Sequence, residues 1–176
     1  MKIGVFCSAN EQIDQEFFAM TKELGEWMAA EGHSLVFGGT DMGLMDCIAK
    51  AVHENGGMVI GVVPVIVEKR GRASDYNDVT IPCDNLSDRK DLMVAQSDVF
   101  LALPGGIGTL DEIFTIAAAH TIGYNDKKVI LYNMKGFWNP VIAALDNLQQ
   151  QGLVRGDYHD YIDIADSLDD IKRLLS

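Results

Sequence analysis

The sequence contains few cysteines, and their spacing does not suit a structural role. Cys7, Cys47 and Cys83 lie far apart, and none belongs to a C-x-x-C pair. The four histidines are scattered in the same way. A disulfide framework or a zinc site requires ligands at recognisable spacings. We therefore predict free thiols in a reducing compartment and no bound metal ion.

Long apolar runs are also absent. No stretch approaches the roughly 20 residues of a membrane-spanning helix. Met1 and Lys2 lead directly into a short apolar segment, without the h-region of a signal peptide. We therefore expect a cytoplasmic protein without a membrane partner. With 176 residues, 48% of them hydrophobic, the chain suits one covered core, so residues 1–176 are expected to form a single domain.

Positive charge is scarce. The chain has 14 lysines and arginines against 26 aspartates and glutamates, which gives a net charge of −12. Nucleic acids and anionic membranes bind to broad basic surfaces, so neither is expected as the main partner. A phosphate group would have to be bound by a few local groups, which makes the position of each cation informative.

Several familiar motifs are missing. The sequence contains no G-x-x-x-x-G-K-[ST] P-loop and no G-x-S-x-G nucleophile elbow. The glycines at 106 and 108 lack the third glycine of the dinucleotide fingerprint, and they follow a late strand instead of the first. A P-loop ATPase and an NAD or FAD cofactor are therefore disfavoured, and we predict no cofactor.

Short apolar runs alternate with helical patterns along the chain. Runs typical of buried parallel strands occur at 2–7, 34–37, 58–64, 99–103, 129–132 and about 161–164. Residues 65–85 break this pattern, with a short extended piece at 79–81 and a basic cluster that either stays solvated or folds over a phosphate. The alternation predicts an α/β fold: a Rossmann-like, doubly wound parallel sheet with helices on both faces.

A glycine-rich turn follows the strand at 99–103. Residues 104–112 read PGGIGTLDE, and three glycines in four residues allow the backbone to approach a ligand without interference from Cβ atoms. Thr109 is expected to open the next helix. Free N–H groups at a helix start bind anions, usually phosphate. The turn therefore predicts a phosphate site.

Glu112, at the end of this turn, has two interpretations. Thr109 and Glu112 have the spacing of a capping box, in which the glutamate accepts a hydrogen bond from the N-cap N–H. Spacing alone favours that structural role. A carboxylate near a phosphate site also repels the phosphate, which makes sense if a nearby part of the ligand becomes positive during reaction, as a ribosyl oxocarbenium ion does.

A second glycine-rich turn reads GGTDMGLM at residues 38–45. Its glycines either pack the following helix against the sheet or let a nucleotide approach. Arg89 and Lys90 fall near the first turn of a helix expected over 86–96, where the helix dipole disfavours cations. Either they pair with Asp88 and Asp91, which contributes little, or an anionic ligand lies between this helix and the glycines at 105–108.

Three segments together resemble the LOG (Lonely Guy) family of nucleoside 5′-monophosphate phosphoribohydrolases. Residues 104–112 match its PGGxGTxxE motif, residues 38–45 are similar to its GGGxxGLMG turn, and residues 88–90 are similar to its ERK segment. The likeness covers Ile3 to about Asn133. It implies a homodimer that hydrolyses the N-glycosidic bond of a purine nucleoside 5′-monophosphate, either AMP or an N6-modified, cytokinin-type AMP, to free base and ribose 5-phosphate.

The resemblance also implies roles for individual residues. Arg89 and Glu112 would be the catalytic pair. The backbone of Gly105, Gly106, Gly108 and Thr109 would cradle the 5′-phosphate. From their places at strand ends and at a helix start, we also expect Ser8, Gly39 and Lys90 to contact the phosphate or the ribose. Some relatives carry the label lysine decarboxylase, but nothing in the sequence resembles a pyridoxal-phosphate site. The alternatives are a non-catalytic carrier or sensor of a phosphorylated ligand, and a sugar-phosphate enzyme without preference among bases.

Overall fold

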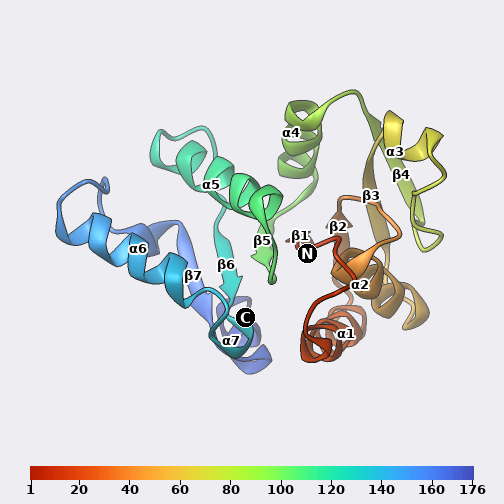
Figure 1. Cartoon of the computed structure of the whole chain (residues 1–176), viewed down its shortest axis with the longest axis horizontal. Helices are drawn as coiled ribbons and strands as arrows, with labels where there is room; N and C mark the ends of the chain where they lie inside the picture. Colours follow the sequence, from red (N-terminus) through yellow and green to blue (C-terminus); the bar gives the residue numbers. More distant parts are fainter.

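Seven parallel strands form one sheet in the order β4-β3-β2-β1-β5-β6-β7 (Figure 1). The computed structural model describes all residues 1–176. The strands are β1 (Lys2–Phe6), β2 (Ser34–Phe37), β3 (Val59–Pro64), β4 (Val79–Cys83), β5 (Val99–Ala102), β6 (Val129–Tyr132) and β7 (Ile162–Ala165). The central strand β1 pairs with β2 on one edge and with β5 on the other, so Ile3 lies between Leu35 and Val99. The expected α/β fold with a doubly wound parallel sheet is confirmed.

Helices cover both faces of this sheet (Figure 1). They are α1 (Gln15–Ala30), α2 (Gly43–Glu54), α3 (Val65–Lys69), α4 (Leu86–Gln96), α5 (Ile107–Thr121), α6 (Asn139–Gln150) and α7 (Leu168–Leu174), with 3₁₀ turns at Met134–Gly136 and Tyr158–Asp160. In Figure 1, α4 and α5 lie above the sheet, α6 lies to the left of β6 and β7, and α1, α2 and α7 lie below the sheet. None of these helices combines the length and the apolarity that crossing a bilayer would require.

Two apolar cores follow from this arrangement, one on each face. The first joins Leu24 of α1 and Ile48 of α2 to inward side chains of the sheet such as Val5 and Leu101. The second joins α4, α5 and α6 to the opposite side chains of the same strands, among them Phe6 and Phe100, whose rings stack 5.0 Å apart. Alternate residues of each buried strand therefore contribute to opposite cores.

Residues 65–85 are more ordered than the sequence indicates. They contain the short helix α3 and a full edge strand, β4, instead of a long loop. The segment between α3 and β4 contacts the glycine-rich turn at residues 38–45, since Arg72 Nε lies 2.9 Å from an Asp41 carboxylate oxygen. Arg72 is therefore paired with Asp41 while its side chain stays 46% exposed. Lys69 and Arg70 are exposed as well, and none of the three basic residues lines the main cavity. The extended piece expected at 79–81 is confirmed as part of β4, but the sequence underestimated its length because most of β4 is exposed and lacks an apolar pattern.

Candidate active site

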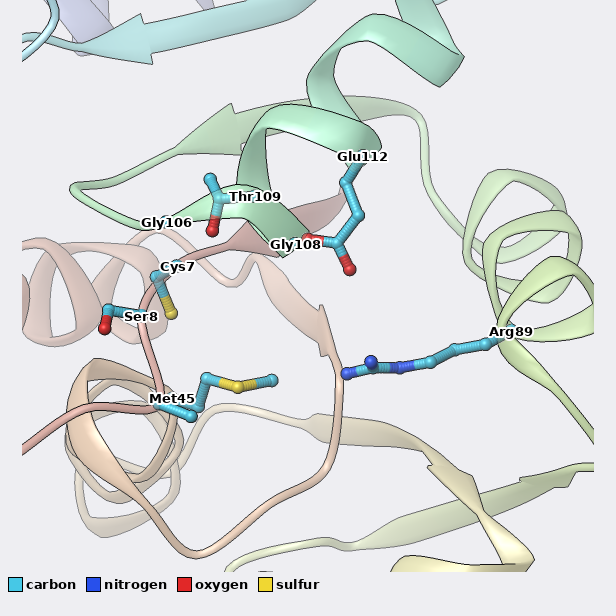
Figure 2. Close-up of a pocket in the computed structure, with 9 residues that line it drawn as sticks. Cys7, Ser8, Met45, Arg89, Gly106, Gly108, Thr109 and Glu112 are labelled. Carbon is cyan, nitrogen blue, oxygen red and sulfur yellow. The ribbon is translucent and has the colours of Figure 1, made fainter.

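A cavity of about 300 Å³ opens at the carboxyl ends of β1 and β5. The strand order reverses between these two strands, which is where open α/β sheets bind ligands. The cavity draws on four parts of the chain: the end of β1, the first turn of α2, α4, and the start of α5. Its lining residues are Cys7, Ser8, Ala9, Met45, Arg89, Gly106, Gly108, Thr109 and Glu112 (Figure 2).

The helix α5 begins three residues earlier than the sequence suggests, since its N-cap is Gly106 and not Thr109. No side chain caps this end of the helix. Thr109 is therefore the third helical residue, and the predicted capping box of Thr109 with Glu112 is wrong. The first N–H groups of a helix have no intrahelical acceptors, and at the start of α5 no side chain accepts hydrogen bonds from them. This helix end thus faces the cavity with free donors.

The glycines of this turn leave space above the backbone. A Cβ atom at Gly106 or Gly108 would meet nothing within 4 Å. At Gly105 it would lie 2.1 Å from Oγ1 of Thr109, so this glycine instead makes room for the buried threonine. The open backbone of Gly106 and Gly108, beside the positive end of α5, suits an anionic group.

Glu112 projects into the cavity from the second turn of α5 (Figure 2). Burial raises the pKa of its carboxyl to about 7. The negative charge of Asp111 raises this pKa further, whereas Arg89 and Lys90 act in the opposite direction. Near neutral pH the carboxyl can therefore hold or release a proton, which is the property required of a general acid or base.

Arg89 enters the cavity from the other side. Its helix α4 is capped by Asn85, whose side chain accepts hydrogen bonds from Ser87 and Asp88 N–H groups, both at 3.0 Å. Figure 2 shows the guanidinium and the Glu112 carboxylate pointing toward the same space. The two side chains do not form an ion pair, and Arg89 Nε is buried without a hydrogen-bond partner. A buried donor without a partner is costly, which favours a ligand at this position.

Lys90 has a different environment. Its ammonium group lies 2.9 and 3.1 Å from the two carboxylate oxygens of Asp111 and 3.2 Å from Thr115 Oγ1. It lines a smaller adjoining cavity of about 70 Å³ instead of the main one. Of the two alternatives for the cations, pairing with Asp88 and Asp91 does not occur, because Lys90 pairs with Asp111 instead. Asp88 accepts a hydrogen bond from the Asp84 N–H.

Ser8 joins the two glycine-rich turns. Its N–H donates to the Pro104 carbonyl (3.0 Å), and its carbonyl accepts from the Leu44 N–H (2.9 Å). Ser8 also lines the cavity, whereas Gly39 does not. A Cβ at Gly39 would lie 2.3 Å from Val63 Cγ2, and its φ of +74° requires a glycine. The structure therefore gives Gly39 a packing role against β3 and does not place it in the cavity.

Sequence analysis missed four residues at the site. A Cβ at Gly38 would lie 1.5 Å from Arg89 Nη2, so only a glycine leaves room for the guanidinium. Met45, Cys7 and Ala9 supply the apolar part of the lining. Burial raises the pKa of the Cys7 thiol well above its usual value, which keeps it protonated. The turn at 38–45 was noted, but sequence alone does not show which of its glycines contacts the arginine.

No group of three or more His, Cys, Asp or Glu side chains is arranged to hold a metal ion. The chemistry available from this chain at the cavity is therefore that of one carboxyl, one guanidinium and backbone N–H groups. Together these groups can bind an anion and stabilise a positive centre next to it.

Comparison with known proteins identifies the family of this chain. A protein-family model described as "Possible lysine decarboxylase" matches residues 45–175. The chain is 34% identical over 154 residues to rice (Oryza sativa subsp. japonica) "Probable cytokinin riboside 5'-monophosphate phosphoribohydrolase LOGL2", covering 88% of this chain and 63% of that protein. It is 31% identical over 171 residues to Mycobacterium tuberculosis "Cytokinin riboside 5'-monophosphate phosphoribohydrolase", covering 97% and 91% of the two chains.

Among solved structures, the Moco carrier protein from Chlamydomonas reinhardtii superposes with a TM-score of 0.74 at 25% identity, covering 99% of this chain and 94% of that one. That likeness concerns the whole sheet and its flanking helices. The family is fixed by the sequence matches, of which the mycobacterial one spans nearly the full length of both proteins. The chain belongs to the LOG family.

Proposed function

We propose that this protein is a nucleoside 5′-monophosphate phosphoribohydrolase. The observation that carries the proposal is that Glu112 and Arg89 line one cavity from opposite sides, next to the open glycines at the start of α5. One carboxyl and one guanidinium face the ligand space without neutralising each other. The names of the relatives support this reaction, since they are called phosphoribohydrolases.

The proposed mechanism assigns each group to a part of the substrate. The 5′-phosphate would accept hydrogen bonds from the N–H groups at Gly108 and Thr109, at the positive end of α5. The C1′–N bond breaks as positive charge grows on the ribose, and its electron pair leaves with the base, which gains a proton from solvent. Glu112 stabilises the charge on the ribose and takes a proton from the water whose oxygen bonds to C1′. Arg89 holds the phosphate or ribose in register with the carboxylate.

We propose a purine 5′-monophosphate as the substrate, either AMP or an N6-modified, cytokinin-type AMP. The relatives' names point to cytokinin riboside 5′-monophosphates. The apolar side of the cavity, formed by Met45, Cys7 and Ala9, suits a flat base better than a second charged group. A sugar-phosphate enzyme would instead show no preference among bases.

The alternative is a non-catalytic carrier of a phosphorylated ligand. The observation that favours it is the likeness in fold to the Moco carrier protein. A carrier needs the open glycines and the free arginine, but it does not need the carboxyl of Glu112. The two functions therefore differ at one side chain.

The test is a chromatographic assay of purified protein with AMP, GMP, CMP and N6-prenylated AMP, with detection of the free base. Wild type should release base, and Glu112→Gln should lower kcat by about 1,000-fold or more while ligand binding, measured by thermal shift, persists. Arg89→Ala should lower both turnover and binding. Ligand binding without base release from any nucleotide would overturn the hydrolase and favour the carrier.

We also propose that the protein works in the cytoplasm as a homodimer. The resemblance implies two copies, and an apolar groove of about 350 Å³ between α5 and α6 offers a surface for the second one. Phe114, Leu148 and Leu153 line it and are 42%, 41% and 70% exposed. Exposed apolar surface of this kind is typical of subunit contacts. Sedimentation equilibrium of wild type and Leu153→Glu tests it.

A further inference from the structure

Two adjacent cations on α4 have opposite environments. Arg89 forms no ion pair, and its Nε is buried without a partner. Lys90 has three N–H donors and three oxygen acceptors within 3.2 Å, two on Asp111 and one on Thr115. Its side chain is 21% exposed. Lys90 therefore has no free donor for a phosphate, whereas Arg89 has.

The acceptors of Lys90 all lie on α5. Asp111 precedes Glu112, and Thr115 follows it by three residues. The ammonium group of Lys90 therefore donates hydrogen bonds to α5 on both sides of Glu112 in the sequence. No other side-chain hydrogen bond joins α4 to α5. These hydrogen bonds thus join α4, which carries Arg89, to α5, which carries Glu112, at positions adjacent to both residues.

We propose that Lys90 is a positioning residue, which ties α4 to α5 through Asp111 and Thr115 and thereby fixes Arg89 across the cavity from Glu112. This inference rests on the proposed hydrolase function. It differs from the role expected from the position of Lys90 in the sequence, a direct contact with substrate. Asp111 has the same positioning role as Lys90, although neither Lys90 nor Asp111 lines the main cavity.

The link also balances charge beside the reacting carboxyl. The charged groups that act on Glu112 are Arg89 and Lys90 from α4 and Asp111 from α5. The thiol of Cys7, after β1, also faces Glu112, and its pKa is raised by burial and by the Glu112 charge. Lys90 lowers the pKa of Glu112, and Asp111 raises it. Removing either partner alone therefore moves the titration of Glu112, in opposite directions for the two variants.

A double-mutant cycle separates positioning from direct binding. Lys90→Met and Asp111→Asn should each lower kcat by about tenfold or more, since small displacements of catalytic groups are costly. The double variant should lose no more than either single variant. Lys172→Met, which breaks the exposed pair with Asp169 on α7, is the matched control and should act as wild type. A raised KM in Lys90→Met with full activity in Asp111→Asn would show direct binding and overturn the proposal.

The pH profile adds a readout that a purely structural link would not change. The acid limb of kcat/KM should move to higher pH in Lys90→Met and to lower pH in Asp111→Asn. Shifts in the same direction, or none, would contradict the proposed balance of charge around Glu112.

Hydrogen exchange judges the link independently of turnover. Amides in the first turn of α4 should exchange about tenfold faster in both single variants, because a fastening near that turn is lost. Unchanged exchange would overturn the proposal even in an active enzyme. If wild type releases no base from any nucleotide, the proposed function fails, and faster exchange in both variants still supports the link.

Discussion

The two glycine-rich turns of this protein have similar compositions and different physical roles. In the turn at 38–43, added Cβ atoms would meet Arg89, Val63 or the backbone at Ala9 within 2.5 Å. In the turn at 105–108, Gly106 and Gly108 face open space. The first turn uses glycine to let parts of the protein approach one another. The second uses it to leave room for a ligand.

This difference shows that the two turns act on the site in different ways. In the turn at 38–43, Gly38 leaves space for the guanidinium of Arg89. Gly43 allows close packing against the loop that carries Ser8. The second turn presents the helix end and, six residues after Gly106, the carboxyl of Glu112. Substitutions in the first turn should change folding or geometry, and those in the second should change ligand binding.

The strongest test of the comparison is Gly43→Ala. Gly43 has a φ of +58°, and a Cβ there would lie 2.5 Å from the Ala9 carbonyl carbon. Backbone strain and overpacking should together lower the free energy of unfolding by about 3 kcal/mol, and Tm by roughly 6–12 °C. Calorimetry measures both. Gly56→Ala is the matched control, because Gly56 has a φ of +80° and nothing within 4 Å. Equal losses in the two variants would refute the packing role.

Gly38→Ala should affect activity more than stability. Its Cβ would lie 1.5 Å from Arg89 Nη2 and 2.3 Å from Met45 Cε, both of which are ends of flexible side chains. The guanidinium would move, so kcat/KM should fall about 100-fold with little change in Tm. Steady-state kinetics of Gly38→Ala, Arg89→Ala and the double variant decide the matter. A further loss in the double variant would show that Gly38 acts separately from Arg89.

The carboxylates that follow the two turns should differ in their effect on pH dependence. Burial raises the pKa of both Asp46 and Glu112, but Asp46 accepts a hydrogen bond from Ser74 Oγ (3.2 Å) and lies outside the cavity. If ionised Glu112 is the active form, kcat/KM should fall about tenfold per pH unit below pH 7. The profile of Asp46→Asn should match that of wild type. An acid limb that follows Asp46 instead would assign the titration to the wrong turn.

The smallest expected effect is that of Gly108→Ala. Gly108 is the second residue of α5 and its Cβ position is open, so alanine should raise the free energy of unfolding by about 0.5 kcal/mol. The same methyl group would narrow the cavity and raise KM several-fold. Thermal denaturation and kinetics give the two values. A lower Tm would mean that this turn is packed like the first.

Much of the fold followed from the sequence, and the site followed in part. Buried strands such as β1 and β6 were recognisable because they have continuous apolar runs. Of the mostly exposed β4, only the extended piece at 79–81 was expected, because few of its side chains are buried. Arg89 and Glu112 were identified by their segments, and the structure brings them to one cavity.

The remaining features depend on contacts between distant segments. Which glycine lies against Arg89 is decided by the packing of α4 over the end of β2, and the sequence holds no local trace of it. The bond between Lys90 and Asp111 joins residues of two helices that flank β5. A helix start without a side-chain cap, as at Gly106, likewise resembles a capped one when a threonine and a glutamate follow at the right spacing.

The central position of β1 has a consequence for synthesis of the chain. One edge of this strand can pair with β2 early, but the other waits for β5 at residues 99–102. Until then the emerging chain exposes an apolar strand edge, a surface on which two nascent chains can pair wrongly. The cavity needs the same late strand, so the binding site cannot form on the ribosome before the strand edge is closed. Ligand binding can therefore stabilise only chains in which β5 already covers the open edge of β1, and it cannot prevent wrong pairing of shorter nascent chains.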